Sequence, residues 1–282
     1  MKVISWNLLH GQPLPPPLEP LSSDLAHALL HTAATRLATI GAEVIGLQEV
    51  DDFQPRSSNL SQIATMAAAV GAVDWAFAPS VIGTPGENWR KLRDGDPVLE
   101  TGNSRGEEAT PSDPAAKVAR YGIGLISTIP VKNWHRCELG RSVIGLPLAI
   151  PTGKGLRFIY VRDEPRVALA AELTNGFTVV VTHLSFVPFV NYFQLLKIRR
   201  WVRGLPGNPI ILGDLNLGWG LPVRGTHWRS LVNRNTYPSW GAKIQFDYIT
   251  AHIPHFGERI VEELVIPDLG ISDHLPIGVV IA

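Results

Sequence analysis

The sequence predicts an α/β sandwich built from two packed β-sheets with helices on the outside. Short apolar runs typical of buried strands recur along the 282 residues, and amphipathic helical segments are spaced among them. The strands are too many for one doubly wound sheet. Apolar residues make up 45% of the chain, which is ample for a large core. No linker interrupts this pattern, so we expect residues 1–282 to form a single domain.

The first half of the chain alternates strands and helices around one proline-rich loop. Strands are expected at 1–6, 44–47 and 73–78, and helices at 22–40 and 60–70. Ser22 is among the candidate N-caps of the first helix, and Gly41 is its candidate C-cap. From 82 to 117, glycine, proline and charged residues dominate without an apolar period. This segment is interpreted as a long loop, either a mobile loop facing the substrate or plain disorder.

The second half is richer in strands. They are expected at 122–127, 131–138, 156–161, 167–173, 178–182, 209–212, 245–249, 258–265 and 276–281. One helix is expected at 190–203. It carries Lys197, Arg199, Arg200 and Arg203 with Trp201 between them, a basic face that either contacts nucleic acid or is simply solvated.

Composition narrows the class of protein. Lysine plus arginine number 25 and aspartate plus glutamate number 25, and this neutrality argues against a dedicated nucleic-acid binder. The single cysteine, Cys137, excludes an intrachain disulfide and reads as an inert thiol. No apolar run approaches the ~20 residues that span a bilayer, and the chain opens on a strand rather than a signal peptide. We expect a soluble, monomeric protein of the cytoplasm.

Polar residues stand at the ends of several apolar strand runs. They are Asn7, Glu49, His183, Asp214, Asn216, Asp247, Asp273 and His274. Converging strand ends can collect carboxylates in one place, and such a cluster needs a cation to offset its repulsion. Carboxylate and amide oxygens suit Mg²⁺ or Mn²⁺, whereas the single cysteine and scattered histidines argue against zinc. A divalent ion held this way can activate water against a phosphoryl group.

Each of these signals has an ordinary structural explanation when it is taken alone. Asp214 and Asn216 follow a glycine and fit a tight turn. Glu49 fits a solvated strand end, His183 a core histidine, and Asn7 a turn cap. The joint occurrence of all these residues in one chain favours a catalytic site over the separate explanations.

The motifs resemble those of the endonuclease/exonuclease/phosphatase superfamily, whose members include DNase I, AP endonucleases, inositol-polyphosphate 5-phosphatases and neutral sphingomyelinases. They are Ser5-Trp6-Asn7, Leu47-Gln48-Glu49-Val50, Gly124-Leu125-Ile126-Ser127, Thr182-His183-Leu184, Gly213-Asp214-Leu215-Asn216, Phe246-Asp247-Tyr248-Ile249 and Ser272-Asp273-His274-Leu275-Pro276. They cover nearly the whole chain in the family's order. The resemblance implies a four-layer, DNase I-like sandwich of two mixed sheets flanked by helices, with the site at one edge.

The resemblance also implies roles for individual residues. Glu49 is similar to the main metal ligand, with Asn7 contacting metal or phosphate and Asp273 assisting the metal. His183 resembles the phosphate-contacting histidine. Asp214 resembles the residue that orients or deprotonates water, with Asn216 as its companion. His274 resembles the catalytic histidine, with Asp247 as its orienting carboxylate; either Asp214 or His274 can be the general base.

The substrate class is less constrained than the chemistry. The family resemblance implies a Mg²⁺- or Mn²⁺-dependent hydrolase of a phosphodiester or a phosphomonoester. The alternative is an endonuclease or exonuclease on DNA or RNA, and a catalytically silent binding module is disfavoured by the full set of polar residues. AP endonucleases place a tyrosine where Thr182-His183-Leu184 stands here, which favours the DNase-like and phosphatase-like branches.

Overall fold

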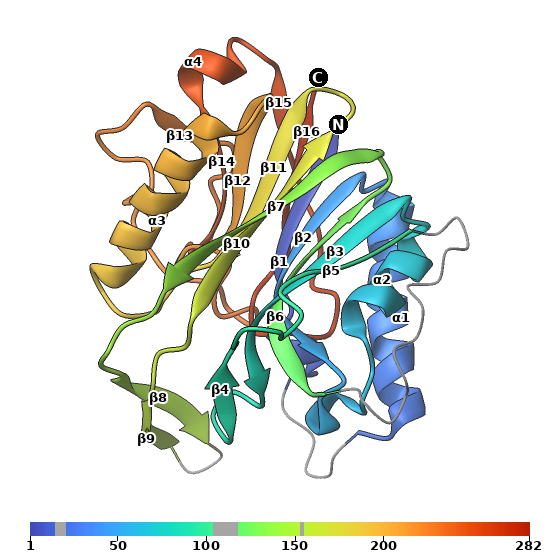
Figure 1. The fold of residues 1–282 in the computed structure, drawn as a ribbon, viewed down its shortest axis with the longest axis vertical. Coiled ribbons are helices and arrows are strands. Elements are labelled where there is room, and N and C mark those ends of the chain that lie inside the picture. The colour runs from blue at the N-terminus through green and yellow to red at the C-terminus, as the bar shows by residue number, and fades with distance from the viewer. Residues whose placement is uncertain (15–20, 104–117, 153–154) are drawn as a thin grey trace.

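Two mixed β-sheets pack face to face in the protein (Figure 1). The computed structural model describes residues 1–14, 21–103, 118–152 and 155–282, and side chains at 148–159 are outside this description. The proline-rich segment at 15–20 and residues 104–117 of the expected long loop therefore lie outside the described residues. Among the described residues, no helix is both long and apolar enough to cross a lipid bilayer.

The first sheet has eight strands and contains the N-terminal strand near its middle. In spatial order they are β15 (Val261–Leu264), β16 (Ile277–Ile281), β1 (Lys2–Asn7), β2 (Val44–Asp52), β6 (Arg120–Ser127), β3 (Asp74–Gly83) and β4 (Trp89–Lys91), with β5 (Glu100–Asn103) also paired to β3. Strand β1 is parallel to β2 and antiparallel to β16. The two ends of the described chain are therefore neighbours in one sheet (Figure 1).

The second sheet has six strands. In spatial order they are β13 (Trp228–Ser230), β14 (Asp247–His252), β12 (Asn208–Asp214), β11 (Phe177–His183), β10 (Arg166–Leu173) and β7 (Val131–Gly140). Strands β11 and β12 are parallel, and β14 is antiparallel to β12. A separate hairpin of β8 (Leu146–Thr152) and β9 (Gly155–Val161) extends from one end of this sheet (Figure 1).

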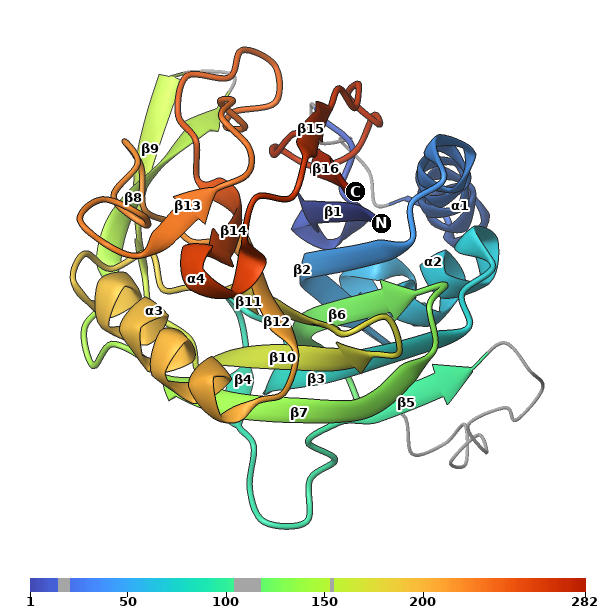
Figure 2. The ribbon, with the colours of Figure 1, turned by 90° about the horizontal axis from the view of Figure 1, so that it is seen from above.

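Helices cover the outer faces of both sheets (Figure 2). Helices α1 (Ser23–Ile40) and α2 (Gln62–Val70) pack on the first sheet, and α3 (Val190–Trp201) packs on the second. A short helix, α4 (Ile253–Phe256), follows β14. This arrangement of helix, sheet, sheet and helix confirms the predicted four-layer sandwich.

Alternation along the strands explains why the sheets pack as they do. On β11, Val179 and Val181 face the core between the sheets, whereas Val180 faces the layer beneath α3. The two sheets pack closely at Gly46 of β2. A Cβ atom placed there would lie 2.1 Å from Leu212 Cδ1, so only glycine fits this position without displacing its neighbours.

Several sequence expectations differ from the structure. The segment 82–117 was expected to be loop, but it contains the end of β3 and the short strands β4 and β5. Their backbone pairing with β3 compensates for the absence of an apolar period. Strand β8 was not anticipated at all. Strand β2 continues through polar residues to Asp52, and the side chains of Gln48, Asp51 and Asp52 are buried; Arg120, for example, binds the Asp52 carboxylate.

Candidate active site

Strand register brings three of the predicted residues side by side in the second sheet. His183 ends β11 and is paired with Asp214, which ends the parallel strand β12. Asp214 is paired in turn with Asp247, the first residue of the antiparallel strand β14. All three side chains are buried. The register therefore places one histidine and two carboxylates at the same edge of the sheet.

The first sheet contributes Asn7 and Glu49 to the same place. Asn7 ends β1, and Glu49 lies in a β-bulge of β2 that shifts the register between Leu47 and Val50. Glu49 has a φ of 54°, a left-handed conformation that is uncommon for a residue other than glycine. A bulge re-aims the side chain at that position. The Asn7 amide nitrogen then donates to Glu49 Oε1 at 3.0 Å and to Asp214 Oδ2 at 3.1 Å, joining the two sheets.

The loop before β16 supplies Asp273 and His274, and it is fixed to β1 by specific contacts. Ser272 has a φ of 76°, and its hydroxyl donates to the Asn7 carbonyl at 2.6 Å while accepting from the His274 amide at 3.1 Å. The Trp6 indole donates to the His274 carbonyl at 3.0 Å. These bonds hold the backbone of His274 against β1, although more than 260 residues separate the two.

His274 forms a hydrogen-bonded pair with Asp247 and faces Asp214. Its Nδ1 lies 2.8 Å from Asp247 Oδ2, and its Nε2 lies 3.7 Å from Asp214 Oδ2. Burial alone would lower the pKa of His274, but the charges of Asp247 and Asp214 overcome this and raise the pKa to about 10. Burial raises the pKa of Asp214 to about 7, against the opposing effect of His274. A cationic imidazole therefore faces a basic carboxylate.

His183 has the opposite electrostatic character. Burial, together with the nearby charges of Arg166 and His274, holds its pKa well below the usual value, so the ring is neutral. Asn216 Nδ2 lies 3.3 Å from His183 Nε2 and donates to the Leu184 carbonyl at 3.0 Å. The Asn216 backbone amide donates to Asp214 Oδ1 at 2.9 Å. Asn216 thus orients both Asp214 and His183.

The donor set at this edge fits a hard divalent cation. Glu49 and Asp273 bring carboxylates to the cluster, and burial, with the charge of Glu49 contributing, raises the pKa of Asp273 to about 6. A cation would relieve this crowding of negative groups. Among the described residues, Asp214, Asp247 and His274 also bring ligand atoms within 4.8 Å of one another. However, Asp247 is engaged by His274, so Glu49 and Asp273 are the better candidates.

Asn7 contacts both carboxylates through its side-chain amide. Its amide nitrogen, not its oxygen, faces the carboxylates, and its Oδ1 accepts from the Leu9 amide at 3.1 Å. In this arrangement Asn7 is a hydrogen-bond donor that orients Glu49 and Asp214. The other predicted residues are brought together at one edge.

Sequence reasoning missed three residues at this edge. The Tyr237 ring lies 5.0 Å from the His274 ring. Arg166 is buried and pairs with Asp163 at 3.6 Å, and its charge also acts on His183. His10 is close enough to be influenced by Glu49. Of the three, only Arg166 could have been noticed in the sequence, because the charged run Asp163-Glu164-Pro165-Arg166 lies between apolar strands.

The family model for the Endonuclease/Exonuclease/phosphatase family matches residues 4–274. The chain belongs to this family. The match spans every candidate site residue described above, and it confirms the family resemblance predicted from the motifs. A comparison with curated protein sequences finds no match.

Solved structures share the fold at low sequence identity. A mannosyl-6-phosphatase of Bacteroides thetaiotaomicron is 12% identical with a TM-score of 0.56, covering 100% of this chain and 99% of its own. A family protein of Bacteroides vulgatus is 12% identical with a TM-score of 0.58, covering 100% and 98%. The human Nocturnin catalytic domain is 16% identical with a TM-score of 0.51, covering 100% and 94%. These likenesses establish the DNase I-like fold of this family member.

Proposed function

We propose that this family member is a metal-dependent phosphoesterase that hydrolyses a phosphodiester or phosphomonoester by in-line attack of water. The observation that carries the proposal is the facing pair of Asp214 and His274, 3.7 Å apart, with Asp247 bonded to the far side of the imidazole. Asp214 is then a proton acceptor and His274 a cation, and the two lie side by side among buried residues. Hydrolysis of a phosphate ester needs both.

His274 is proposed to stabilise negative charge on the phosphoryl group. Its Nδ1 proton is held by Asp247, so its Nε2 proton points away from Asp247 and toward Asp214. The raised pKa keeps the ring cationic near neutral pH. Charge that develops on the phosphoryl oxygens during attack would be stabilised by this proton more than charge in the ground state.

Asp214 is proposed as the base that orients and deprotonates the water. Burial gives it a pKa near 7, close to neutral pH, which suits proton acceptance. One oxygen is held by the Asn216 backbone amide, and the other is shared between Asn7 and the two histidines. With both oxygens held, the carboxylate loses little freedom when it takes the proton.

Glu49 and Asp273 are the residues proposed to hold Mg²⁺ or Mn²⁺. When bound, the ion would polarise a phosphoryl oxygen and offset the charge of the substrate. Asn7, at the end of the neighbouring strand β1, donates to the Glu49 carboxylate and orients it. His183, which Asn216 orients, is proposed to contact a phosphate oxygen.

A hollow near the candidate site is large enough to hold the part of a substrate that lies beyond its phosphate group. It has a volume of about 470 Å³ and lies between the β3–β4 turn and the β9 end, lined by Trp89, Arg90, Arg141, Tyr160 and Arg162 among others. Arg141 donates to the Asp163 carbonyl, and Ser185 donates to the Asp163 carboxylate two residues after His183. The cationic lining favours an anionic substrate.

The same hollow bears on the alternative of a nuclease. Both Arg141 and Arg162 lie over the Trp89 ring, at 5.8 Å and 5.9 Å from its centre. A nucleobase would have to displace a guanidinium to stack there, whereas a second phosphate would meet the two arginines directly. The lining therefore favours contacts to anionic groups over base stacking. A substrate panel that compares plasmid DNA and abasic duplex with phosphoinositides and sphingomyelin tests this preference.

The test is hydrolysis of bis-p-nitrophenyl phosphate and p-nitrophenyl phosphate with and without chelator. Activity should vanish with EDTA and return with Mg²⁺ or Mn²⁺. Asp214→Asn and His274→Ala should each lower kcat by roughly 10²–10⁴-fold while far-ultraviolet circular dichroism stays unchanged.

The matched controls are Asp24→Asn and His31→Ala, two exposed positions on α1. Both should retain full activity. Undiminished turnover in fully chelated protein would exclude the metal mechanism, and normal turnover of the Asp214 and His274 variants would exclude the proposed site.

A further inference from the structure

Tyr237 lies in a segment that is bonded to the loop before β16. The Leu275 amide donates to the Thr236 carbonyl at 2.9 Å, and the Ser239 amide donates to the Asp273 carbonyl at 2.7 Å. These two bonds lie on either side of Tyr237, and a third joins the Ser239 hydroxyl to the same loop. The backbone at Tyr237 is therefore fixed against the residues that carry the candidate site.

The side chain of Tyr237 packs against the candidate catalytic histidine. The centre of its ring lies 5.0 Å from that of His274 and 5.7 Å from that of Phe246. The backbone of Tyr237 is also paired with Ile244. Two aromatic neighbours and a paired backbone limit the directions in which the tyrosine hydroxyl can point.

The hydroxyl of Tyr237 is within electrostatic reach of the carboxylates of the site. Burial raises its pKa, and the charges of Asp273, Asp214 and Glu49 raise it further. The phenol therefore keeps its proton near neutral pH and is available as a donor. The side chain is half-buried, and its hydroxyl forms no hydrogen bond with the described residues of the chain.

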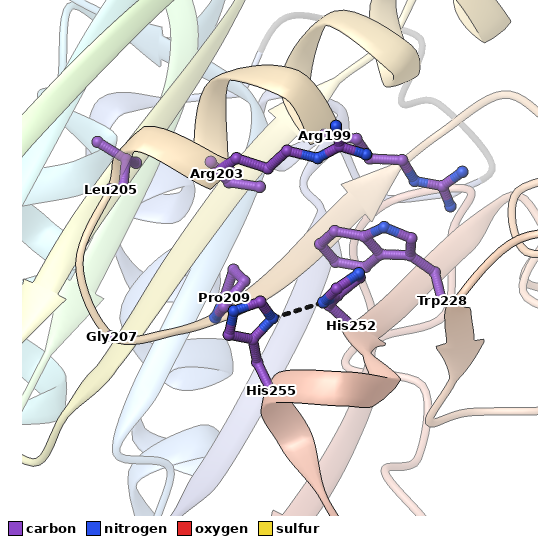
Figure 3. Close-up of a pocket in the computed structure, with 9 residues that line it drawn as sticks. Arg199, Arg203, Leu205, Gly207, Pro209, Trp228, His252 and His255 are labelled. Carbon is purple, nitrogen blue, oxygen red and sulfur yellow. Dashed lines mark hydrogen bonds between the residues drawn. The ribbon is translucent and has the colours of Figure 1, made fainter.

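An aromatic ring against a histidine does not make a site on its own. The Trp228 ring lies 5.3 Å from the His252 ring at the other end of the second sheet (Figure 3). Trp228 is buried, and none of the described residues that line this hollow is acidic. Tyr237 differs because its polar atom is influenced by three carboxylates and its side chain is partly exposed. This difference favours a role in the chemistry over a role in packing alone.

A neutral donor suits this position better than a cation. Negative charge spreads over the oxygens of the phosphoryl group during transfer, and donors aimed at those oxygens stabilise it. A lysine or arginine beside Glu49 and Asp273 would pair with the carboxylates that are proposed to hold the ion. A phenol hydroxyl carries no charge, so it leaves those carboxylates free.

We propose that Tyr237 is a further catalytic residue, whose hydroxyl donates a hydrogen bond to a non-bridging oxygen of the phosphoryl group as water attacks. This rests on the function proposed above for the same site. His274 and Tyr237 then contact the phosphoryl group from neighbouring positions, the first as a cation and the second as a neutral donor. No covalent bond forms or breaks at Tyr237, which keeps its proton throughout.

Tyr237→Phe is the decisive substitution, because it removes the hydroxyl and keeps the ring against His274. At saturating Mg²⁺ with bis-p-nitrophenyl phosphate, kcat should fall roughly 10- to 100-fold, while KM should change by less than about threefold. The midpoint of urea unfolding should equal that of the parent. Tyr192→Phe makes the same change at an exposed tyrosine of α3 and should retain full kcat.

Two further measurements separate a direct contact from an indirect one. The pH–rate profile of Tyr237→Phe should keep both limbs of the parent profile, because Asp214 and His274 titrate as before. Tyr237→Leu, which also removes the ring, should be slower than Tyr237→Phe. If Tyr237 only positions His274, then Tyr237→Phe should be as active as the parent and Tyr237→Leu alone should be slow, and that result would overturn the proposal.

The parent protein and Asp214→Asn are assayed beside these variants, so that this inference and the proposed function can fail separately. Activity that is lost in Asp214→Asn and complete in Tyr237→Phe would exclude the role of Tyr237 alone. A lower urea midpoint in Tyr237→Phe, or a shifted alkaline limb, would show that the hydroxyl acts through the fold or through His274. A parent protein without metal-dependent hydrolysis would overturn both proposals.

Discussion

Replacing Gly46 by alanine tests whether the close approach of the two sheets fixes the active site. The new Cβ would lie 2.1 Å from Leu212 Cδ1 and 3.0 Å from Val181 Cγ2. Ordinary contact begins near 3.4 Å, so the leucine methyl must move by more than 1 Å. Leu212 and Val181 are fully buried in the core between the sheets. Overpacking of this kind costs about 1–3 kcal/mol.

The displacement should also reach the catalytic edge. Leu212 is two residues from Asp214, and Gly46 is three residues from Glu49. The Asn7 amide reaches Asp214 of the second sheet with a bond of 3.1 Å, which an extra 0.5 Å between the sheets would break. We therefore expect lower kcat together with lower stability, measured by urea unfolding and by hydrolysis of bis-p-nitrophenyl phosphate.

A double-mutant cycle isolates the contact. Leu212→Ala alone should cost about 2–5 kcal/mol, and Gly46→Ala added to it should cost much less than in the parent, because the clashing methyl is gone. Gly204→Ala, where a new Cβ meets open space, is the control and should be near neutral. Strictly additive free energies, or a Gly46→Ala protein as stable as the parent, would refute the close-packing explanation.

Three further predictions concern charge and substrate binding. Asp247→Asn should lower the pKa of His274, lower kcat by roughly 10²–10⁴-fold and move the alkaline limb of the pH–rate profile downward; an unmoved limb would contradict the pairing. Burial, with the charge of a nearby arginine, lowers the pKa of His10 to about 4 from 6.5, so the folded state prefers the neutral ring. The resulting contribution to the free energy of unfolding is complete above pH 6.5 and is lost as pH falls toward 4, by at most ~3 kcal/mol. In urea unfolding across this range, His10→Gln should flatten the dependence of that free energy on pH, and an unchanged dependence would contradict the prediction. Trp89→Ala frees two arginines and should raise KM roughly three- to tenfold with little change in kcat, whereas an unchanged KM across the substrate panel would place the substrate elsewhere.

Local sequence signals predicted the regular elements well where capping and apolar period agreed. Ser22 accepts from the Leu25 amide, and Gly41 ends α1 in the left-handed conformation, as the sequence indicates. Strand ends were less predictable, because polar residues continue β2 beyond Leu47. The basic face expected on the third helix is incomplete for a related reason: Arg199 is buried beneath Trp228, which a helical period alone cannot reveal.

The composition of the site was more accessible from sequence than its geometry. Each polar residue at a strand end could be named, because a charge after an apolar run is locally unusual. The left-handed backbone of Glu49 could not be foreseen, since it arises from a bulge against β6. Nor could the contact of Tyr237 with His274, which depends on a long irregular segment. Such features come from pairing between distant segments, which no local window contains.

The place of β1 between β2 and β16 has a consequence for how activity arises during synthesis. Asn7 is synthesised well before the strand that pairs with β1 on one side, residues 277–281. Contacts such as Trp6 with the His274 carbonyl have very high sequence separation, which slows folding. A nascent chain that stops before His274 lacks part of the candidate site, so the site can be completed only after His274 and β16 have been made.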